Sequence, residues 1–336
     1  MINLQEIIID SRILAQRYIV RDGFVFTCID YPANIYDAIV IKYPPNAQCF
    51  SPTINVPFCS LDDQICFINN NKIEKALIIA DNIDFITKCP TLKHIRVVPS
   101  NNANDNFDYS PLYKLPEIKA LQCTTAYGKK NKFFEHIDCS KINGLQLIHA
   151  SDRGIENYNK VDTLRSLGLT GYEKSDLHEA FCSSILHTLS IYQSKIKTLE
   201  GIQNSQKIQC VYLHYNRHLQ SIDALSKVKK TLKALRIENC SKIEDFSILG
   251  ELENLELLEL SGSNEIANLD FIKKMKHLKT FIFNVNVKDG DISPCLKLSY
   301  AYSEKSRKHY NLKDSDLPKG EYIRGNENLE KWFRLE

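Results

Sequence analysis

The chain has 336 residues, of which 43% are hydrophobic and 25% charged, with 43 basic against 41 acidic side chains and a formal net charge of +2. This length provides for about two domains and a sizeable core. The near-neutral balance argues against a nucleic-acid partner, which usually brings a pronounced basic excess, and no apolar run approaches the roughly 18 residues of a membrane span.

The first residues and the cysteines indicate where the protein works. Glu6, Asp10 and Arg12 interrupt the apolar run at the start of the chain, so this run does not form the core of a secretory signal peptide. We therefore expect a cytoplasmic location. The eleven cysteines include no C-x-x-C pair, the spacing that zinc ribbons and thioredoxin-like motifs need. Most of them are expected to be buried and reduced.

The first hundred residues contain short β-branched runs bounded by Pro, Asn or Asp. These runs predict strands at 37–42, 76–80 and 94–98. The alternating run 24–29 follows Arg21-Asp22-Gly23 and predicts a hairpin. We interpret residues 1–72 as a separate region of mixed α/β or β structure.

A repeat dominates the chain from about residue 118. In its clearest copy, the apolar residues are spaced three positions apart. The spacing becomes two between Leu258 and Leu260 and then returns to three. A short strand followed by a helical or 3₁₀ return explains this change of period. The leading apolar residue of each copy recurs every 22 to 24 residues, at Ile118, Ile142, Leu164, Leu186, Ile208, Leu232, Leu255 and Leu278.

The repeat resembles that of leucine-rich repeat proteins of the short, roughly 22-residue bacterial or internalin-like type. The strand signature L-x-x-L-x-L fits residues 186–191, 208–213, 232–237, 255–260 and 278–283. The family's Asn or Cys, three positions after the last strand apolar residue, is matched by Asn216, Cys240 and Asn286. Ser194 and Ser263 are substitutes for it, whereas Ala126, Ala150 and Tyr172 depart from the pattern. The match is strongest over 186–290.

The resemblance implies an α/β solenoid, a right-handed leucine-rich repeat horseshoe with parallel strands on its concave face. One repeat cannot bury its apolar residues alone, so neighbours stack and share a continuous core. We assign residues 73–296 to the solenoid and residues 1–72 to a region that caps it. Residues 297–336 form a short C-terminal cap, in which Leu329, Trp332 and Phe333 share one helical face; a binding tail is the alternative.

Catalytic and cofactor motifs do not occur in the sequence. It has no G-x-x-x-x-G-K-[ST] loop, G-x-G-x-x-G turn, G-x-S-x-G elbow or H-E-x-x-H helix. Bacterial ubiquitin ligases have similar repeats and also carry a ligase domain. Only about forty residues follow the repeats in this sequence, which leaves no room for such a domain. We predict no enzyme, no cofactor and no metal site. An enzyme in the N-terminal region would have to use Asp30, Asp37, Asp62 and Asp63, and this stays an alternative.

The residues between the strand apolar positions change character along the chain. They are small and polar in the earlier copies and aromatic or charged from Tyr192 onward. Tyr and Arg are enriched at interface hot spots, because they bury a large area and keep a polar group. We predict partner binding by the concave face through Tyr192, Tyr212, His214, Tyr215, Arg236, Glu238 and Glu259. The alternative is that these residues only keep the surface soluble, with Arg236 pairing with Glu238 or Glu259.

The sequence therefore predicts a non-catalytic module that binds a protein partner. Its richness in Lys, Ile and Asn is typical of a low-GC bacterial genome. Bacterial proteins of this size and kind are similar to immunity proteins that neutralise a toxin. A translocated effector that binds a host protein and a cytosolic adaptor that binds a signalling protein are the alternatives.

Overall fold

The computed structural model describes residues 5–8, 17–27, 37–47, 57–100, 102–103, 107–123 and 137–321. Asp30 and the predicted helix with Leu329, Trp332 and Phe333 lie outside the described residues. The chain divides into two compact units, Met1–Tyr158 and Asn159–Glu336. Among the described residues, no helix has the length and apolarity that a membrane crossing needs.

The first unit begins with antiparallel strands, which pair in the order β1 (Gln5–Ile8), β2 (Arg17–Arg21), β3 (Phe24–Thr27) and β4 (Ala38–Tyr43). Asp22 and Gly23 connect β2 to β3, with φ of 53° and 83°. Two positive φ values are what a two-residue hairpin turn of type I′ requires. The predicted hairpin and the predicted strand at 37–42 are confirmed.

From β4 onward the pairing in the first unit is parallel. The strands that follow β4 are β5 (Lys75–Ala80), β6 (His94–Pro99), β7 (Ala120–Cys123) and β9 (Leu147–Ser151). The strands predicted at 76–80 and 94–98 are thus confirmed. The segments between these strands contain α1 (Leu61–Asn70), η1 (Asp84–Lys88), η2 (Ser110–Lys114), β8 (Ile137–Asp138) and η3 (Cys139–Lys141). After β9 come η4 (Asp152–Gly154) and β10 (Ile155–Glu156), which pairs with β8.

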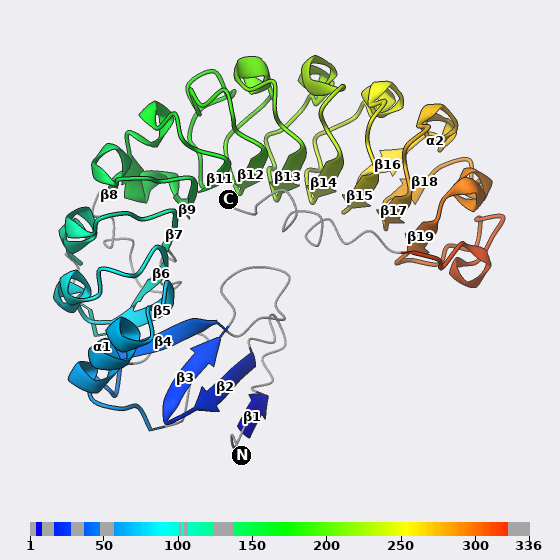
Figure 1. The fold of residues 1–336 in the computed structure, drawn as a ribbon. Helices are drawn as coiled ribbons and strands as arrows, with labels where there is room; N and C mark the ends of the chain where they lie inside the picture. Colours follow the sequence, from blue (N-terminus) through cyan, green and yellow to red (C-terminus); the bar gives the residue numbers. More distant parts are fainter. Residues whose placement is uncertain are drawn as a thin grey trace. The chain divides into compact units, whose positions relative to one another are not determined.

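The second unit is built from one parallel strand per repeat. Its strands are β11 (Ser166–Thr170), β12 (Thr188–Tyr192), β13 (Cys210–His214), β14 (Ala234–Glu238), β15 (Leu257–Ser261), β17 (Thr280–Phe283) and β19 (Tyr300–Ser303). Within this unit the strands lie on the inner side of an arc and the helical returns on its outer side (Figure 1). The returns include η6 (Ile202–Asn204), η7 (Asp223–Val228), η8 (Ser247–Glu251), α2 (Asp270–Lys274) and η9 (Ser293–Lys297).

Three smaller groups complete the described elements. β16 (Glu265–Ile266) and β18 (Asn286–Val287) form a parallel pair between neighbouring returns. The 3₁₀ helix η5 (Tyr158–Lys160) lies at the boundary of the two units in the chain, and η10 (Asp314–Asp316) follows β19.

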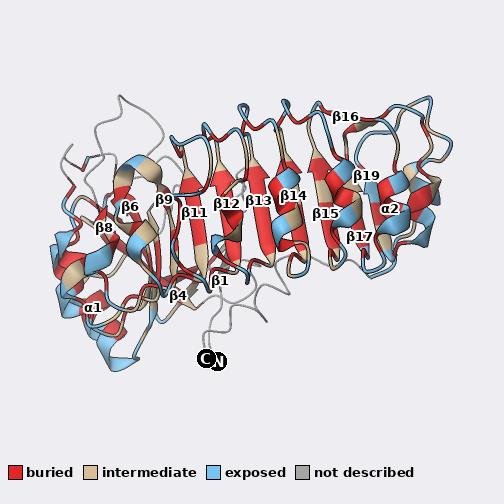
Figure 2. Ribbon diagram, turned by 90° about the horizontal axis from the view of Figure 1, so that it is seen from above, coloured by how far each residue is buried: buried red, intermediate tan, exposed pale blue. Residues whose placement is uncertain are grey.

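This architecture is the leucine-rich repeat solenoid that the sequence predicts. The apolar strand positions align in register, so that Leu235 lies opposite Leu258 and Leu258 opposite Phe281. All three side chains are fully buried, and Figure 2 shows the buried positions along these strands in red. Each repeat thus adds one layer to a continuous core, because no single repeat could bury its own apolar side chains.

One repeat lies three residues from its predicted place. The sequence puts its leading apolar residue at Ile142, yet Leu121 of β7 pairs with Ile148 of β9. Ile148 and Ala150 are therefore the core residues of this strand, and the fully buried Leu145 takes the leading position. Ile142, Leu145 and Ile148 are spaced by three residues, so the L-x-x-L part of the signature fits at two offsets. Strand pairing, which the sequence does not show, decides between them.

Buried amides close the bends after β13 and β15. Asn216 accepts hydrogen bonds from the backbone N–H of Ser194 at 3.0 Å and from its hydroxyl at 2.6 Å, and donates to the carbonyl of Ile191 at 2.9 Å. Asn264 donates to the carbonyls of Cys240 and Ile243 in the same manner. These amides supply partners to backbone groups that the bend would otherwise leave unpaired.

We expect the substitution Asn216→Ala to lower the free energy of unfolding by about 2–4 kcal/mol, because a buried carbonyl and a buried N–H lose their partners. Asn204→Ala is the matched control. Asn204 also donates to carbonyls of the preceding repeat, but it is an exposed residue at the end of η6, where water can replace its side chain, so its loss is expected to stay below about 1 kcal/mol. Urea denaturation followed by circular dichroism measures both, and equal losses would contradict the buried-amide role.

Candidate binding face

The side of β12–β17 that faces away from the core presents three rows of side chains, each running across neighbouring strands. The first row contains Thr188, Cys210, Ala234, Leu257 and Thr280. The middle row contains Ser190, Tyr212, Arg236, Glu259 and Ile282. The last row contains Tyr192, His214, Glu238 and Ser261. We call these rows together the strand face.

In the middle row, Arg236 links its two neighbours. Its guanidinium carbon lies 5.3 Å from the centre of the Tyr212 ring, and its Nε lies 3.1 Å from Oε2 of Glu259. The side chains of Arg236 and Glu259 are 22% and 25% exposed. Burial raises the pKa of the Glu259 carboxyl, and the positive charge of Arg236 opposes that rise. This cluster of three holds a cation between an aromatic face and a carboxylate.

In the last row, His214 joins Tyr192 to Glu238. The Tyr192 ring and the His214 imidazole are stacked, with centres 4.8 Å apart and planes 12° apart. Nδ1 of His214 lies 2.8 Å from Oε2 of Glu238. Burial raises the pKa of the Tyr192 hydroxyl. The last row thus forms a second cluster, in which the imidazole is held in place by stacking on an aromatic ring and by its contact with a carboxylate.

Tyr215 stands directly beyond β13. Its φ is 53°, and its N–H donates to the carbonyl of Glu238 at 2.7 Å. Gln193 and Asn239 have the same left-handed conformation after β12 and β14, with N–H groups bonded to the next strand. This hydrogen bond favours a conformation that costs energy in a residue with a β-carbon. It turns the Tyr215 side chain outward, where 43% of its surface is exposed.

The structure places the seven predicted residues on or just beyond four neighbouring strands. Six form the two clusters described above and Tyr215 lies at their edge. Arg236 pairs with Glu259, the second of the two partners that the sequence leaves open. The strand pattern predicts that Tyr212 is exposed, but only 7% of its surface is exposed. Burial raises the pKa of its hydroxyl.

The first row was missed by the sequence reasoning. Cys210, Ala234 and Leu257 form a buried apolar cluster with Tyr212, although they lie on the strand face. Burial raises the pKa of the Cys210 thiol to about 12. The available signal was the residue type: this position carries Cys, Ala and Leu in successive repeats, where an open surface would favour polar side chains.

Two acidic residues of the N-terminal region have partners in the described structure, and the described cysteines are unpaired. No group of three His, Cys, Asp or Glu side chains able to hold a metal occurs among the described residues. Asp37 pairs with Lys75 at 2.9 Å, and Asp63 accepts a hydrogen bond from the Ser60 hydroxyl at the start of α1. The described cysteines are free thiols, and the buried ones are Cys89, Cys139, Cys210, Cys240 and Cys295.

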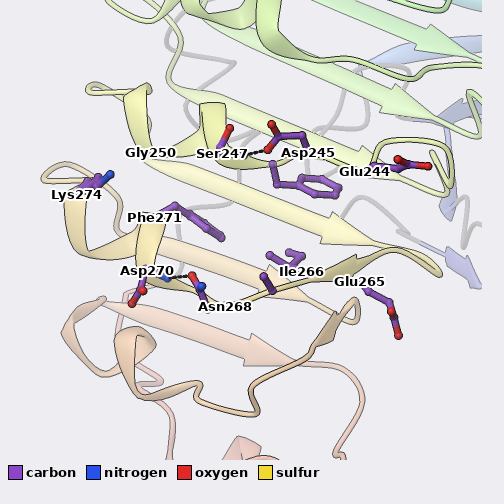
Figure 3. Close-up of a pocket in the computed structure, with 12 residues that line it drawn as sticks. Glu244, Asp245, Ser247, Gly250, Glu265, Ile266, Asn268, Asp270, Phe271 and Lys274 are labelled. Atoms are coloured by element: carbon purple, nitrogen blue, oxygen red, sulfur yellow. Dashed lines mark hydrogen bonds between the residues drawn. The ribbon is translucent and has the colours of Figure 1, made fainter.

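A hollow of about 360 Å³ lies on the outer side of the second unit, between the returns that contain η8 and α2 (Figure 3). Phe246, Ile266 and Phe271 contribute its apolar lining. At its rim, Asp245 accepts a hydrogen bond from the backbone N–H of Ser247 at 2.7 Å. This carboxylate closes a turn, so we assign the hollow to the packing of adjacent repeats.

Comparison with known proteins finds similarity among solved structures. No family model matches the sequence. No curated protein matches it either. Among solved structures, the chain is similar to the crystal structure of an internalin from Listeria monocytogenes, with 16% sequence identity and a TM-score of 0.48. The similarity covers 71% of this chain and 70% of the internalin chain.

Proposed function

We propose that this protein is a non-catalytic module that binds a protein partner on the strand face of its second unit. The observation that carries the proposal is the pair of contacting clusters, Tyr192–His214–Glu238 and Tyr212–Arg236–Glu259. Their side chains are held by stacking and ion pairing on rigid strands. A partner therefore meets groups that are already ordered, which lowers the entropy cost of binding.

The solubility alternative explains these clusters less well. Exposed ion pairs contribute only about 0–1 kcal/mol to stability, so the fold has little need of them. Aromatic rings beside a guanidinium are the side chains that dominate interface energies. The alternation of Arg236 with Glu238 and Glu259 suits a protein surface that carries both signs of charge. The same two carboxylates oppose the binding of a phosphate backbone.

The partner that we propose is a protein toxin, which the module neutralises in the cytoplasm of a bacterial cell. The bacterial composition and the resemblance to immunity proteins support this choice. A stable complex needs an interface of about 1,600 Å² in total. A pull-down of the tagged protein from its own cells, read by mass spectrometry, tests it: a stoichiometric nuclease, protease or pore-forming protein supports the proposal. Signalling proteins alone would indicate an adaptor, and the absence of any partner would indicate an effector delivered to another cell.

The binding face itself is tested by the double variant Tyr192→Ala/Arg236→Ala, which removes one anchor from each cluster. We expect it to weaken partner binding at least about tenfold, or about 1.4 kcal/mol, in isothermal titration calorimetry with an unchanged circular dichroism spectrum. Lys229→Ala is the matched control, because Lys229 pairs with Glu251 at 3.5 Å on the outer side of the same unit. Equal affinity of the double variant and the control would remove the strand face as the binding site.

A further inference from the structure

The strand face continues beyond the seven predicted residues to β19. Tyr302 of β19 lies opposite Ile282 and so extends the middle row by one strand. Of its surface 38% is exposed, and Tyr215, just beyond β13, is 43% exposed. These are two of the three large hydrophobic side chains that are exposed among the described residues. Exposed aromatic rings on a rigid surface are typical contact points for a partner, and this stretch of the face has one at each end.

The charged side chains between these two rings are mostly acidic. Glu304 directly follows β19, where its N–H donates to the carbonyl of Phe283 at 2.9 Å. Together with Glu238 and Glu259 it brings three negative charges to the face, against the one positive charge of Arg236.

A second cation near this part of the face is already balanced. The ammonium of Lys319 lies 5.1 Å from the centre of the Tyr302 ring, but it is paired with Asp314 at 2.8 Å. Lys319 therefore offsets none of the three glutamates.

The three carboxylates are held in place by their neighbours. Glu259 is paired with Arg236, as described above, and Glu238 lies 2.8 Å from Nδ1 of His214, an imidazole that carries a charge only when it is protonated. Glu304 accepts a hydrogen bond from the neutral amide of Asn284 at 2.7 Å. The carboxylates are thus ordered before a partner arrives, yet only one of them has a guanidinium beside it.

The three carboxylates repel one another. Burial raises the pKa of the Glu259 carboxyl, Arg236 opposes this rise, and the negative charges of Glu304 and Glu238 add to it. A positive charge brought to this part of the face from outside would relieve the repulsion, and a further negative charge would increase it.

The spacing of the carboxylates favours an extended group of charges over a single ion. No group of three acidic, His or Cys side chains close enough to hold a metal occurs in the described part of the chain. From β13 to β19 the face crosses four strand spacings, or about 19 Å. About six residues of an extended chain span this distance, so one segment can reach both tyrosines and all three glutamates.

We propose that the partner presents a basic segment to this part of the face, with lysine or arginine side chains at Glu238, Glu259 and Glu304 and apolar side chains against Tyr215 and Tyr302. The inference rests on the proposed function, because it names the chemistry of the partner at the same face. A carboxylate of the partner at Arg236 is compatible with it, as long as basic groups are in excess around that point.

Two synthetic peptides serve as probes of this charge preference. Each is a capped chain of about twelve residues, long enough to cross the face when extended; lysine alternates with tyrosine in one, and glutamate with tyrosine in the other. We expect the lysine peptide to bind at least about tenfold more tightly in fluorescence anisotropy at low salt, and the difference to shrink at high salt. Equal affinity, or no measurable binding of either peptide, would overturn the inference.

The variant Glu238→Gln/Glu259→Gln/Glu304→Gln assigns the preference to the face. Glutamine keeps the shape of glutamate and removes its charge, so we expect the affinity for the lysine peptide to fall at least about tenfold, with an unchanged circular dichroism spectrum. The control Glu179→Gln/Glu244→Gln/Glu253→Gln removes three charges from exposed positions outside the strand face and should keep the affinity. Equal losses in the two variants would mean that the peptide responds to the charge of the whole protein, and the inference would fail.

A single substitution repeats this test at low risk to folding. Glu304 and Glu253 are both exposed. We expect Glu304→Gln to lower the affinity for the lysine peptide at least about threefold, and Glu253→Gln to leave it unchanged. The same affinity in both single variants would contradict the placement of the basic segment at β19.

The variants also separate this inference from the proposed function, once a partner is in hand. Loss of partner affinity in both Tyr192→Ala/Arg236→Ala and the triple glutamine variant, with slower association in the latter, supports both. If only Tyr192→Ala/Arg236→Ala loses affinity, the strand face stands as the binding site and the basic segment is wrong. If neither variant loses affinity, the strand face itself is wrong.

Discussion

The substitution Phe281→Ala is expected to lower the free energy of unfolding by about 3–5 kcal/mol, the usual cost of emptying a buried aromatic site. Phe281 is fully buried in β17. Its ring stacks on Phe283 at 4.8 Å between centres and meets Phe271 edge to face at 6.3 Å. Since Phe271 lies in the helical return of one repeat and Phe281 in the strand of the next, the substitution removes a contact that joins two adjacent repeats.

The neighbouring residue provides the control for this prediction. Ile282 lies on the same strand but points to the strand face, where it is half-buried, so Ile282→Ala is expected to cost less than about 1.5 kcal/mol. Urea denaturation monitored by circular dichroism compares the two variants. If they lose the same stability, Phe281 does not occupy the core position that the register with Leu258 assigns to it.

Gly201→Ala is expected to destabilise the protein by about 2–4 kcal/mol, because two costs add. The φ of Gly201 is 96°, a conformation that costs a residue with a β-carbon about 1–2 kcal/mol. A β-carbon at this position would also lie 2.3 Å from the backbone nitrogen of His178 and 2.4 Å from the carbonyl carbon of Leu177. These are backbone atoms of the preceding repeat, held by the 2.6 Å hydrogen bond from Leu177 to Glu200, so they cannot move away cheaply.

Gly171→Ala separates the two costs. Gly171 has a similar φ of 75°, but a β-carbon there would meet nothing within 4 Å. This variant should therefore lose only the conformational part, about 1–2 kcal/mol. Thermal and urea unfolding of both variants measure the difference. Equal destabilisation of the two would show that the close approach of the repeats at Gly201 does not constrain the fold.

The sequence by itself determined the repeat and therefore the fold. The change from a spacing of three to a spacing of two, across pairs such as Leu258 and Leu260, is a direct consequence of one strand per repeat. The buried Asn216 was visible for the same reason, because a polar residue at a fixed place after each strand has a fixed role. The sequence was less decisive where the spacing was uniform. Ile142, Leu145 and Ile148 allow the repeat to be placed at two offsets, and the pairing of β9 with β7 selects the later one.

The tertiary structure alone decided which residues of the strand face are open. The alternation along β13 puts Cys210, Tyr212 and His214 on one side, and the seven residues that were predicted from this alternation do lie together. Their exposure, however, depends on side chains of the neighbouring repeats. Arg236 pairs with Glu259 because β14 and β15 place the two residues opposite each other. Tyr212 is buried in a cluster that includes residues of two other repeats. Local periodicity records which side of a strand a residue occupies, whereas burial is a property of everything packed against that side.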